Sequence, residues 1–332
     1  MSETERREPV SMRLRTDLAL VLVTLVWGSS FVVVKNVVRD APPLAFVFFR
    51  FLLATLVCLL LALKRPRTPG LLRDGAIVGS LLAGGMIFQV LGQVETSASK
   101  AAFLTGLSVV LTPFAAFART RSLPSLENGI GISLAAVGFV LLTLPQGGGP
   151  INRGDVLVFA CGIVFAFYIV EVSLRAGAHD PSWLTVFQLA MVTLVAGILS
   201  AIFRAAGSAV ELRPIVWEGT FLRGVLYLAT IGTVGTFLTQ TWAQRHMSAT
   251  HAAIIFALEP VWAALLAAWL LDERLGVSGL WGGALVLAGI VVSELRGVRS
   301  PFATLFPKSK KTKNEGVLQK TEVPSRSKES KD

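Results

Sequence analysis

Residues 248–271 read Ser-Ala-Thr-His-Ala-Ala-Ile-Ile-Phe-Ala-Leu-Glu-Pro-Val-Trp-Ala-Ala-Leu-Leu-Ala-Ala-Trp-Leu-Leu, an apolar run with one acid near its midpoint. At about 1.5 Å per residue, a helix of this length crosses the roughly 30 Å hydrocarbon core of a bilayer. Pro260 follows Glu259, so we expect a helix break that frees the carbonyls near Phe256 and Leu258. An acid beside a break at the membrane midplane is typical of a transport site. The alternative is that Glu259 is protonated against a neighbouring helix and Pro260 only kinks its own.

The composition is that of a polytopic membrane protein. Of 332 residues, 53% are hydrophobic and 16% are charged, and the mean hydropathy is +0.66. Much of the formal net charge of +10 lies in the terminal tail and short loops, which indicates cytoplasmic loops rather than nucleic-acid binding. Cys58 and Cys161 lie in apolar segments, and no histidines have the spacing of a zinc site. We therefore predict no disulfide, metal site or cofactor.

Ten apolar segments of about twenty residues follow one another along the chain, and each is a candidate transmembrane helix. Counting Lys and Arg in the loops places both termini in the cytoplasm, with the protein in the cytoplasmic (plasma or inner) membrane and in contact with its lipids. The segments cover approximately residues 18–38, 44–63, 71–93, 99–118, 128–144, 156–174, 183–203, 219–242, 248–271 and 276–295.

An internal repeat divides these segments into two halves. Residues 89–102 align without a gap on residues 240–253, a shift of 151, and a shift of 138 aligns the earlier segments, for example Trp27 with Phe165. The difference fits an insertion around residues 204–218. Five spans is an odd number, so the second half enters the membrane from the opposite face. The predicted regions are a tail at 1–16, a first repeat at 17–145, a hinge at 146–153, a second repeat at 154–296 and a basic disordered cytoplasmic tail at 297–332.

Three motifs resemble the EamA branch of the drug/metabolite transporter superfamily. They are Trp27-Gly-Ser-Ser-Phe31, the stretch from Thr96 through Thr105 to Pro113, and Leu258-Glu-Pro-Val. The resemblance implies an all-α integral membrane fold of ten transmembrane helices, arranged as two inverted five-helix repeats. It also implies an exporter of amino acids or other metabolites, with a central cavity lined by spans one, three, four, six, eight and nine.

Candidate residues fall into two groups. The paired glutamines could hydrogen-bond a solute or bridge helices, and the two aromatic residues could stack on a solute or fill the core. Arg50 is expected to pair with an acid or with backbone carbonyls, although a carboxylate substrate would use the same chemistry. We predict substrate binding for Trp27, Ser30, Gln89, Gln93, Thr105, Tyr168, Gln240, Gln244 and Glu259, and structural or gating roles for Arg50, Pro113, Pro260, Lys100 and His251.

These patterns predict a secondary active transporter that exports small organic metabolites such as amino acids by alternating access. Glu259 would either bind a substrate amine or carry a coupling proton. No phosphate-binding loop and no converging catalytic cluster is present in the sequence, so no enzyme activity or catalytic residue is predicted. A lipid-modifying membrane enzyme and a passive channel for small polar solutes are the alternatives.

Overall fold

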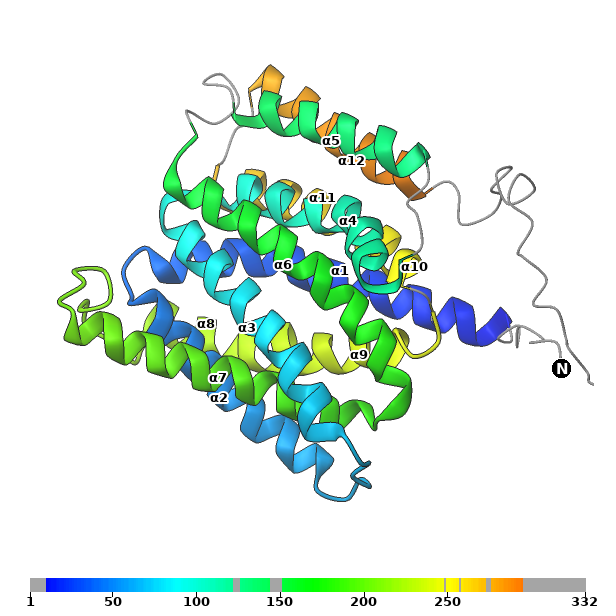
Figure 1. The fold of residues 1–332 in the computed structure, drawn as a ribbon. Helices are drawn as coiled ribbons and strands as arrows, with labels where there is room; N and C mark the ends of the chain where they lie inside the picture. Colours follow the sequence, from blue (N-terminus) through cyan, green and yellow to red (C-terminus); the bar gives the residue numbers. More distant parts are fainter. Residues whose placement is uncertain are drawn as a thin grey trace, which may run out of the picture. The chain divides into compact units, whose positions relative to one another are not determined.

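Helices are the only regular elements in the part of the chain that the computed structural model describes, residues 10–121, 126–143, 151–247, 249–256, 258–272 and 276–294 (Figure 1). The predicted tail at 297–332 lies outside these residues, as do 1–9 of the N-terminal tail and 146–150 of the hinge. The elements are α1 (Val10–Val38), α2 (Pro43–Ala62), α3 (Leu71–Glu95), α4 (Ala98–Thr120), α5 (Leu126–Thr143), α6 (Arg153–Arg175), the short η2 (Ala176–Ala178), α7 (Pro181–Ala205), α8 (Gly219–Ala229), the π-helical η3 (Thr230–Gly235), α9 (Thr236–Ala243), α10 (Ala249–Phe256), α11 (Glu259–Leu270) and α12 (Val277–Glu294).

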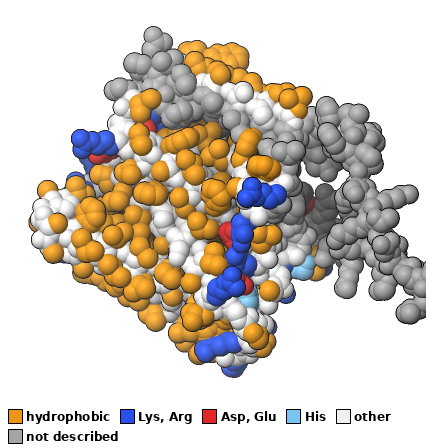
Figure 2. Space-filling model, in the orientation of Figure 1, with side chains coloured by type: hydrophobic (Ala, Val, Ile, Leu, Met, Phe, Trp, Pro, Cys, Tyr) orange, Lys and Arg blue, Asp and Glu red, His pale blue; other side chains and the backbone are white. Residues whose placement is uncertain are grey.

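The surface and the helix lengths are those of a multi-pass membrane protein. Seven helical segments among the described residues are long and apolar enough to cross a bilayer, and shorter apolar segments cover Glu259–Leu270 and Val277–Gly289. Large apolar side chains are exposed outside, including Leu60 (70% exposed) and Trp269 (79%). Figure 2 shows one such face, covered mostly by hydrophobic side chains. A water-soluble domain rarely exposes so continuous an apolar surface, because it would aggregate. The count of ten spans stays a prediction.

Two predicted spans are interrupted rather than continuous. The span at 219–242 passes through η3, where the backbone is π-helical, and the span at 248–271 divides into α10 and α11. Pro260 explains the second break, because it lacks an N–H donor and its ring clashes with the preceding turn. Pro113 behaves differently: it lies inside α4, which continues to Thr120. The two prolines therefore do not play equivalent structural parts.

The helices pack as pairs drawn from the two predicted halves. In Figure 1, α2 lies beside α7 and α5 lies beside α12. Contacts also join α3 to α6, α4 to α6, and α1 to both α9 and α11. Glycine permits the closest approach of α3 and α6, since a Cβ at Gly92 would lie 2.5 Å from Val158 Cγ2 and 2.7 Å from Gly154 O. Small residues stabilise such contacts because membrane helices associate through packing.

The start of α2 is held by a residue from a distant part of the chain. Pro42 provides no side-chain cap, and the backbone N–H groups of Leu44 and Ala45 donate to the carboxylate of Glu211 at 3.1 and 2.8 Å. Ser200 Oγ donates to the same carboxylate at 2.6 Å. An acid at a helix N-terminus satisfies free donors and complements the helix dipole. The 204–218 segment, predicted as an insertion, therefore connects α7 to the start of α2.

The Gly92 contact can be tested with alanine. We expect Gly92→Ala to lower the midpoint of thermal unfolding in detergent, by the equivalent of about 1–3 kcal/mol, because the added methyl group overpacks the α3–α6 contact. Gly129→Ala is the matched control, since nothing lies within 4 Å of a Cβ at that helical glycine. Equal melting of the Gly92 variant and the wild type would contradict the packing described.

Candidate functional site

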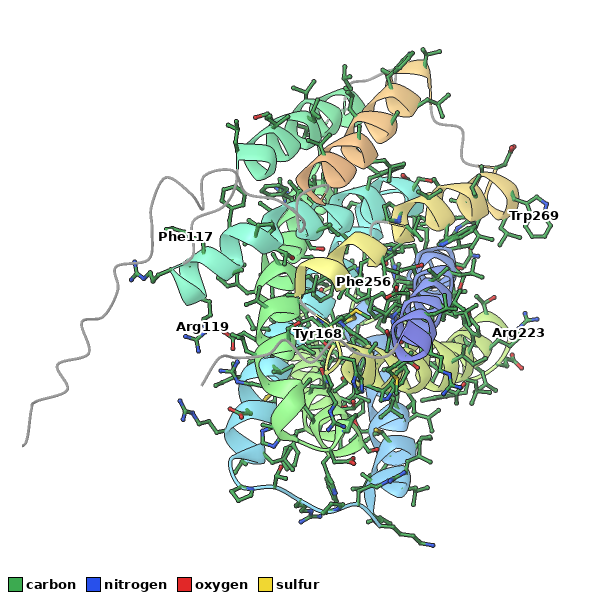
Figure 3. All side chains as sticks on the ribbon, turned by 90° about the vertical axis from the view of Figure 1, so that its right-hand side faces the viewer. Phe117, Arg119, Tyr168, Arg223, Phe256 and Trp269 are labelled. Carbon is green, nitrogen blue, oxygen red and sulfur yellow. The ribbon has the colours of Figure 1, made fainter. Side chains whose placement is uncertain are left out.

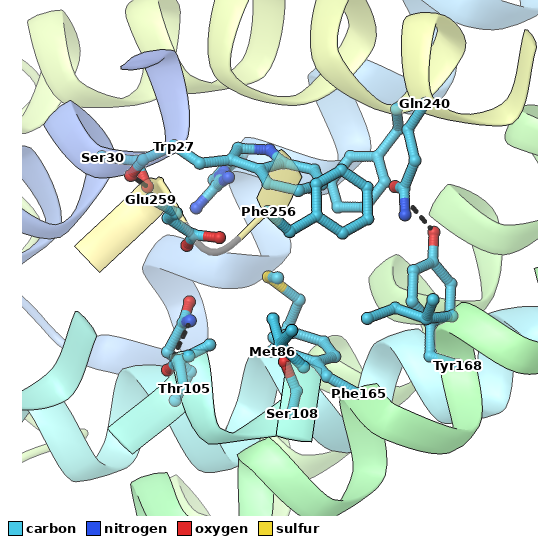
Figure 4. A pocket seen from close by; sticks show the side chains of 16 residues that line it. Trp27, Ser30, Met86, Thr105, Ser108, Phe165, Tyr168, Gln240, Phe256 and Glu259 are labelled. Carbon is cyan, nitrogen blue, oxygen red and sulfur yellow. Dashed lines mark hydrogen bonds between the residues drawn. The ribbon is translucent and has the colours of Figure 1, made fainter. Parts of the chain in front are cut away.

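A cavity of about 50 Å³ lies between the helices, and sixteen residues line it (Figure 4). This volume holds about four water molecules at roughly 10–15 Å³ each, so a larger solute requires the helices to separate. The lining residues come from α1, α2, α3, α4, α6, α9, α10 and α11. They are Trp27, Ser30, Arg50, Met86, Gln89, Thr105, Gly106, Ser108, Val109, Phe165, Tyr168, Ile169, Phe237, Gln240, Phe256 and Glu259.

Glu259 enters this cavity from the break between α10 and α11. It is the first residue of α11, and Figure 4 shows its carboxylate pointing into the cavity. Two glycines on other helices lie close to this part of the chain. A Cβ at Gly28 would lie 2.6 Å from Trp262 Cβ and 3.1 Å from Glu259 O, and one at Gly106 would lie 3.2 Å from Pro260 Cγ. Because Gly28 and Gly106 have no side chain, α1 and α4 can both pack closely against the start of α11.

One detail of the predicted break is wrong. The carbonyl of Leu258 is not free, because it accepts from Trp262 N at 3.1 Å as α11 begins. Pro260, four residues after Phe256, has no N–H to donate to the carbonyl of Phe256. Helical hydrogen bonding thus begins again at the carbonyl of Leu258, two residues after Phe256. The polar group that this part of the chain offers to the cavity is the side chain of Glu259.

Arg50 lies in the same cavity although it was assigned a structural or gating role. Its side chain is 3% exposed. Nε donates to Thr233 Oγ1 at 2.9 Å, and Nη2 is 3.5 Å from Gly232 O; both acceptors belong to the π-helical η3. The guanidinium carbon lies 5.1 Å from the centre of the Phe51 ring. No ion pair within 4.0 Å joins Arg50 to an acid of the described residues. Of the two partners expected for Arg50, an acid or backbone carbonyls, the carbonyl is present, and the hydroxyl of Thr233 is added to it.

Aromatic and amide side chains complete the lining. Trp27 lies 5.6 Å from Phe237 and 5.3 Å from Phe256, measured between ring centres. Tyr168 Oη donates to Gln188 Oε1 at 2.8 Å and is 3.4 Å from Gln240 Oε1. In Figure 3 the labelled Tyr168 and Phe256 lie in the interior, whereas Trp269 and Arg223 project outward. The cavity therefore has apolar aromatic walls with separate polar positions.

Seven of the nine predicted substrate-binding residues line the cavity, and Gln93 and Gln244 do not. Gln93 Nε2 donates to Phe31 O at 3.5 Å, and Gln244 Nε2 donates to Ile169 O at 3.3 Å. Each glutamine thus connects its helix to α1 or α6, the bridging alternative considered from the sequence. Gln93 and Gln244 lie one turn farther along their helices than Gln89 and Gln240, which do line the cavity, and their contact with a substrate stays a prediction.

Lys100 makes an ion pair away from the cavity. Its Nζ is 2.7 Å from Asp155 Oδ2, and the two side chains are 4% and 0% exposed. Asp155 also forms the capping box of α6 with Asn152. Pro113 and Pro260 do not line the cavity either, and the side chain of His251 lies outside the described residues. In the described ranges, no three His, Cys, Asp or Glu side chains gather as a metal site.

The two sequence shifts relate most of the lining residues to one another. Shifts of 138 and 151 form six pairs in which both members face the cavity. Applied to the predicted substrate-binding residues, the shifts would have identified Phe165, Phe256 and Ser108 as further residues of the cavity. The pairs are Trp27 with Phe165, Ser30 with Tyr168, Met86 with Phe237, Gln89 with Gln240, Thr105 with Phe256, and Ser108 with Glu259.

Comparison with known proteins agrees with this architecture. The sequence profile of the EamA-like transporter family matches residues 14–144 and 152–295. The chain belongs to this family. It is therefore a multi-pass membrane transporter, and the resemblance recognised in the three motifs is confirmed.

Relatives of this EamA protein include named transporters. An uncharacterised transporter of Archaeoglobus fulgidus is 31% identical over 285 residues, covering 86% of this chain and 87% of that protein. A "Probable amino-acid metabolite efflux pump" of Salmonella typhimurium is 25% identical, covering 82% and 92%. A solved crystal structure with a TM-score of 0.60 and 18% identity covers 88% of this chain and 100% of the other, a likeness of fold.

The Lys100–Asp155 pair gives a stability prediction. We expect Lys100→Met to lower stability by about 3–5 kcal/mol, because it leaves a buried carboxylate without its cation. The double variant Lys100→Met with Asp155→Asn should recover more than half of this loss, as measured by unfolding in detergent. Lys64→Met, at an exposed position, is the control. A single variant as stable as the wild type would contradict the importance of the buried pair.

Proposed function

We propose that this EamA protein is a secondary active carrier that exports small organic metabolites by alternating access. One observation carries the proposal: the carboxylate of Glu259 points into a cavity enclosed by helices of both predicted halves. A carboxylate is costly at this depth unless a ligand, a proton or water compensates it. The break that positions it gives the site a place where the helices can reorient.

An inverted repeat is supported by the helix contacts. If α6 to α12 repeat α1 to α5, the contact of α3 with α6 has its counterpart in α9 with α1, and that of α4 with α6 in α11 with α1. The α2–α7 and α5–α12 pairs are then their own counterparts. The hydrogen bonds of Gln93 and Gln244 to Phe31 O and Ile169 O obey the same two shifts. Two such halves can exchange conformations around the cavity between them.

The proposed solutes are amino acids or metabolites of similar size. Two relatives, from Salmonella typhimurium and Escherichia coli, are named amino-acid metabolite efflux pumps, at 25% and 24% identity. The cavity adds amide donors and acceptors, two opposite charges and aromatic walls. Glu259 either binds the amine of the solute or carries a coupling proton. The excess of Lys and Arg on one side supports an orientation with both termini in the cytoplasm, and we propose the cytoplasmic membrane as the location of the carrier.

Substitution of Glu259 tests the proposal. Glu259→Gln keeps the size of the side chain and removes its charge, and we expect counterflow of amino acids into proteoliposomes, or their proton-driven accumulation, to fall at least tenfold. Glu259→Ala should fall at least as far. Glu218→Gln, the same change at an exposed acid, should retain wild-type rates. Saturable counterflow distinguishes the carrier from a passive channel.

The two readouts separate the two roles of Glu259. If it carries the proton, Glu259→Gln retains counterflow and loses accumulation against a gradient, since exchange requires no net proton movement. If it binds the amine, both activities fall together. Wild-type rates of both activities in both Glu259 variants would contradict the proposal.

A further inference from the structure

Neither of the two charged residues of the cavity has a charged counterpart in the repeat. Under the shift of 138, Arg50 corresponds to Gln188, and under the shift of 151, Glu259 corresponds to Ser108. Gln188 does not line the cavity; it accepts from Tyr168 at 2.8 Å. Each half therefore provides one charge, of opposite sign, at a place where the other half has a neutral side chain. The cavity is therefore polarised between Arg50 on α2 and Glu259 at the start of α11.

Arg50 and Glu259 share the cavity without pairing directly with each other. No ion pair of 4.0 Å or less joins Arg50 to Glu259, and no hydrogen bond to the carboxylate of Glu259 is formed by the described residues. Uncompensated charges in a poorly hydrated space are unfavourable. A solute with both an anionic and a cationic group would compensate both at once.

Arg50 is held weakly enough to exchange its partners. Its two contacts with η3 use two of the five N–H donors of a guanidinium, and both acceptors are neutral. The contact with Gly232 O is long at 3.5 Å, and Thr236 Oγ1 also donates to this carbonyl at 2.9 Å. A carboxylate accepts stronger, charge-assisted bonds than a hydroxyl or carbonyl does. An anionic group entering the cavity would therefore compete well for the guanidinium.

The partner of Arg50 is itself an unusual element. η3 is π-helical over Thr230–Gly235, and it interrupts the span formed by α8 and α9. Short π-helical segments inside α-helices often occur at functional sites, because the extra residue loosens the backbone ladder. Arg50 joins this segment to α2. Release of Arg50 would remove its hydrogen bonds between α2 and η3, the element that directly precedes α9 with the lining residues Phe237 and Gln240.

From this geometry we propose that Arg50 binds the anionic group of a zwitterionic solute whose cationic group faces Glu259, and that it does so by exchanging its hydrogen bonds to η3. This assignment rests on the proposed carrier function and specifies its solute class. The aromatic and apolar walls of the cavity suit a solute with an apolar side chain. In this proposal, Arg50 gives up its hydrogen bonds to η3 as it binds the anionic group of the solute.

The test compares three probes that share one apolar group: L-valine, isobutylamine, which lacks the carboxylate, and isovalerate, which lacks the amine. Binding to the purified full-length protein is measured by calorimetry. The wild type should bind L-valine at least about tenfold more tightly than either truncated probe. Arg50→Gln should weaken L-valine binding about 10- to 100-fold and change isobutylamine binding less than about threefold. Arg223→Gln, on the exposed face of α8, should leave all three affinities unchanged.

A second variant covers the case in which Arg50→Gln does not fold. Thr233→Val keeps the shape of the side chain and removes the acceptor for Nε. We expect L-valine to bind about fivefold more tightly, since it no longer competes with Thr233, and isobutylamine to bind as before. Unchanged L-valine binding in this variant would overturn the exchange.

Other outcomes separate this assignment from the carrier proposal. Equal losses of L-valine and isobutylamine binding in Arg50→Gln would give Arg50 a purely structural role and overturn the assignment. Wild-type protein that catalyses saturable counterflow of another metabolite but binds L-valine and isobutylamine equally would also overturn it, and the carrier would stand. Absence of saturable counterflow with every metabolite tried would overturn the carrier proposal itself.

Discussion

The close approach of α1 and α4 to the start of α11 is the contact on which the site depends. A Cβ at Gly28 would lie too close to Trp262, at 2.6 Å from its Cβ, and a Cβ at Gly106 would press on Pro260 at 3.2 Å from its Cγ. Because proline interrupts the helix there, the acid is placed at a helix start and its side chain points into the cavity. The backbone break and the glycines act together: without either, the carboxylate would point elsewhere or the helices would stand farther apart.

The two predicted halves contribute corresponding positions to the cavity, but they differ in charge and in backbone structure. The lining pairs related by the two sequence shifts occupy corresponding positions in the two predicted halves, which suits the proposed exchange of conformations around the cavity. Arg50 and Glu259 depart from that symmetry, and so does η3, which lies in α8–α9 while its counterpart α3 is an uninterrupted helix. In the proposed carrier, the charged groups that recognise the solute therefore lie where the two halves differ.

Sequence reasoning found the helices, the family and most of the cavity because these depend on hydropathy, short motifs and a repeat. It did not separate Gln89, which lines the cavity, from Gln93, which does not, because a four-residue spacing identifies the face of a helix and not the depth at which a cavity ends. The π-helical segment was missed because an i to i+5 hydrogen-bond pattern has no residue signature of its own. Glu211 was missed as the cap of α2, since more than 160 residues separate it from Leu44 and only the fold brings them together.

The central claim is that a solute reaches the pocket beside Glu259 from both faces of the membrane. Ser108, the repeat counterpart of Glu259 on the facing helix α4, offers the most direct test. In protein with Cys58 and Cys161 replaced by alanine, Ser108→Cys should react with a membrane-impermeant thiol reagent applied to either face of oriented vesicles, and a saturating transported solute should slow the reaction from both. Reaction from one face only under every condition, or reaction that the solute does not slow, would contradict the account.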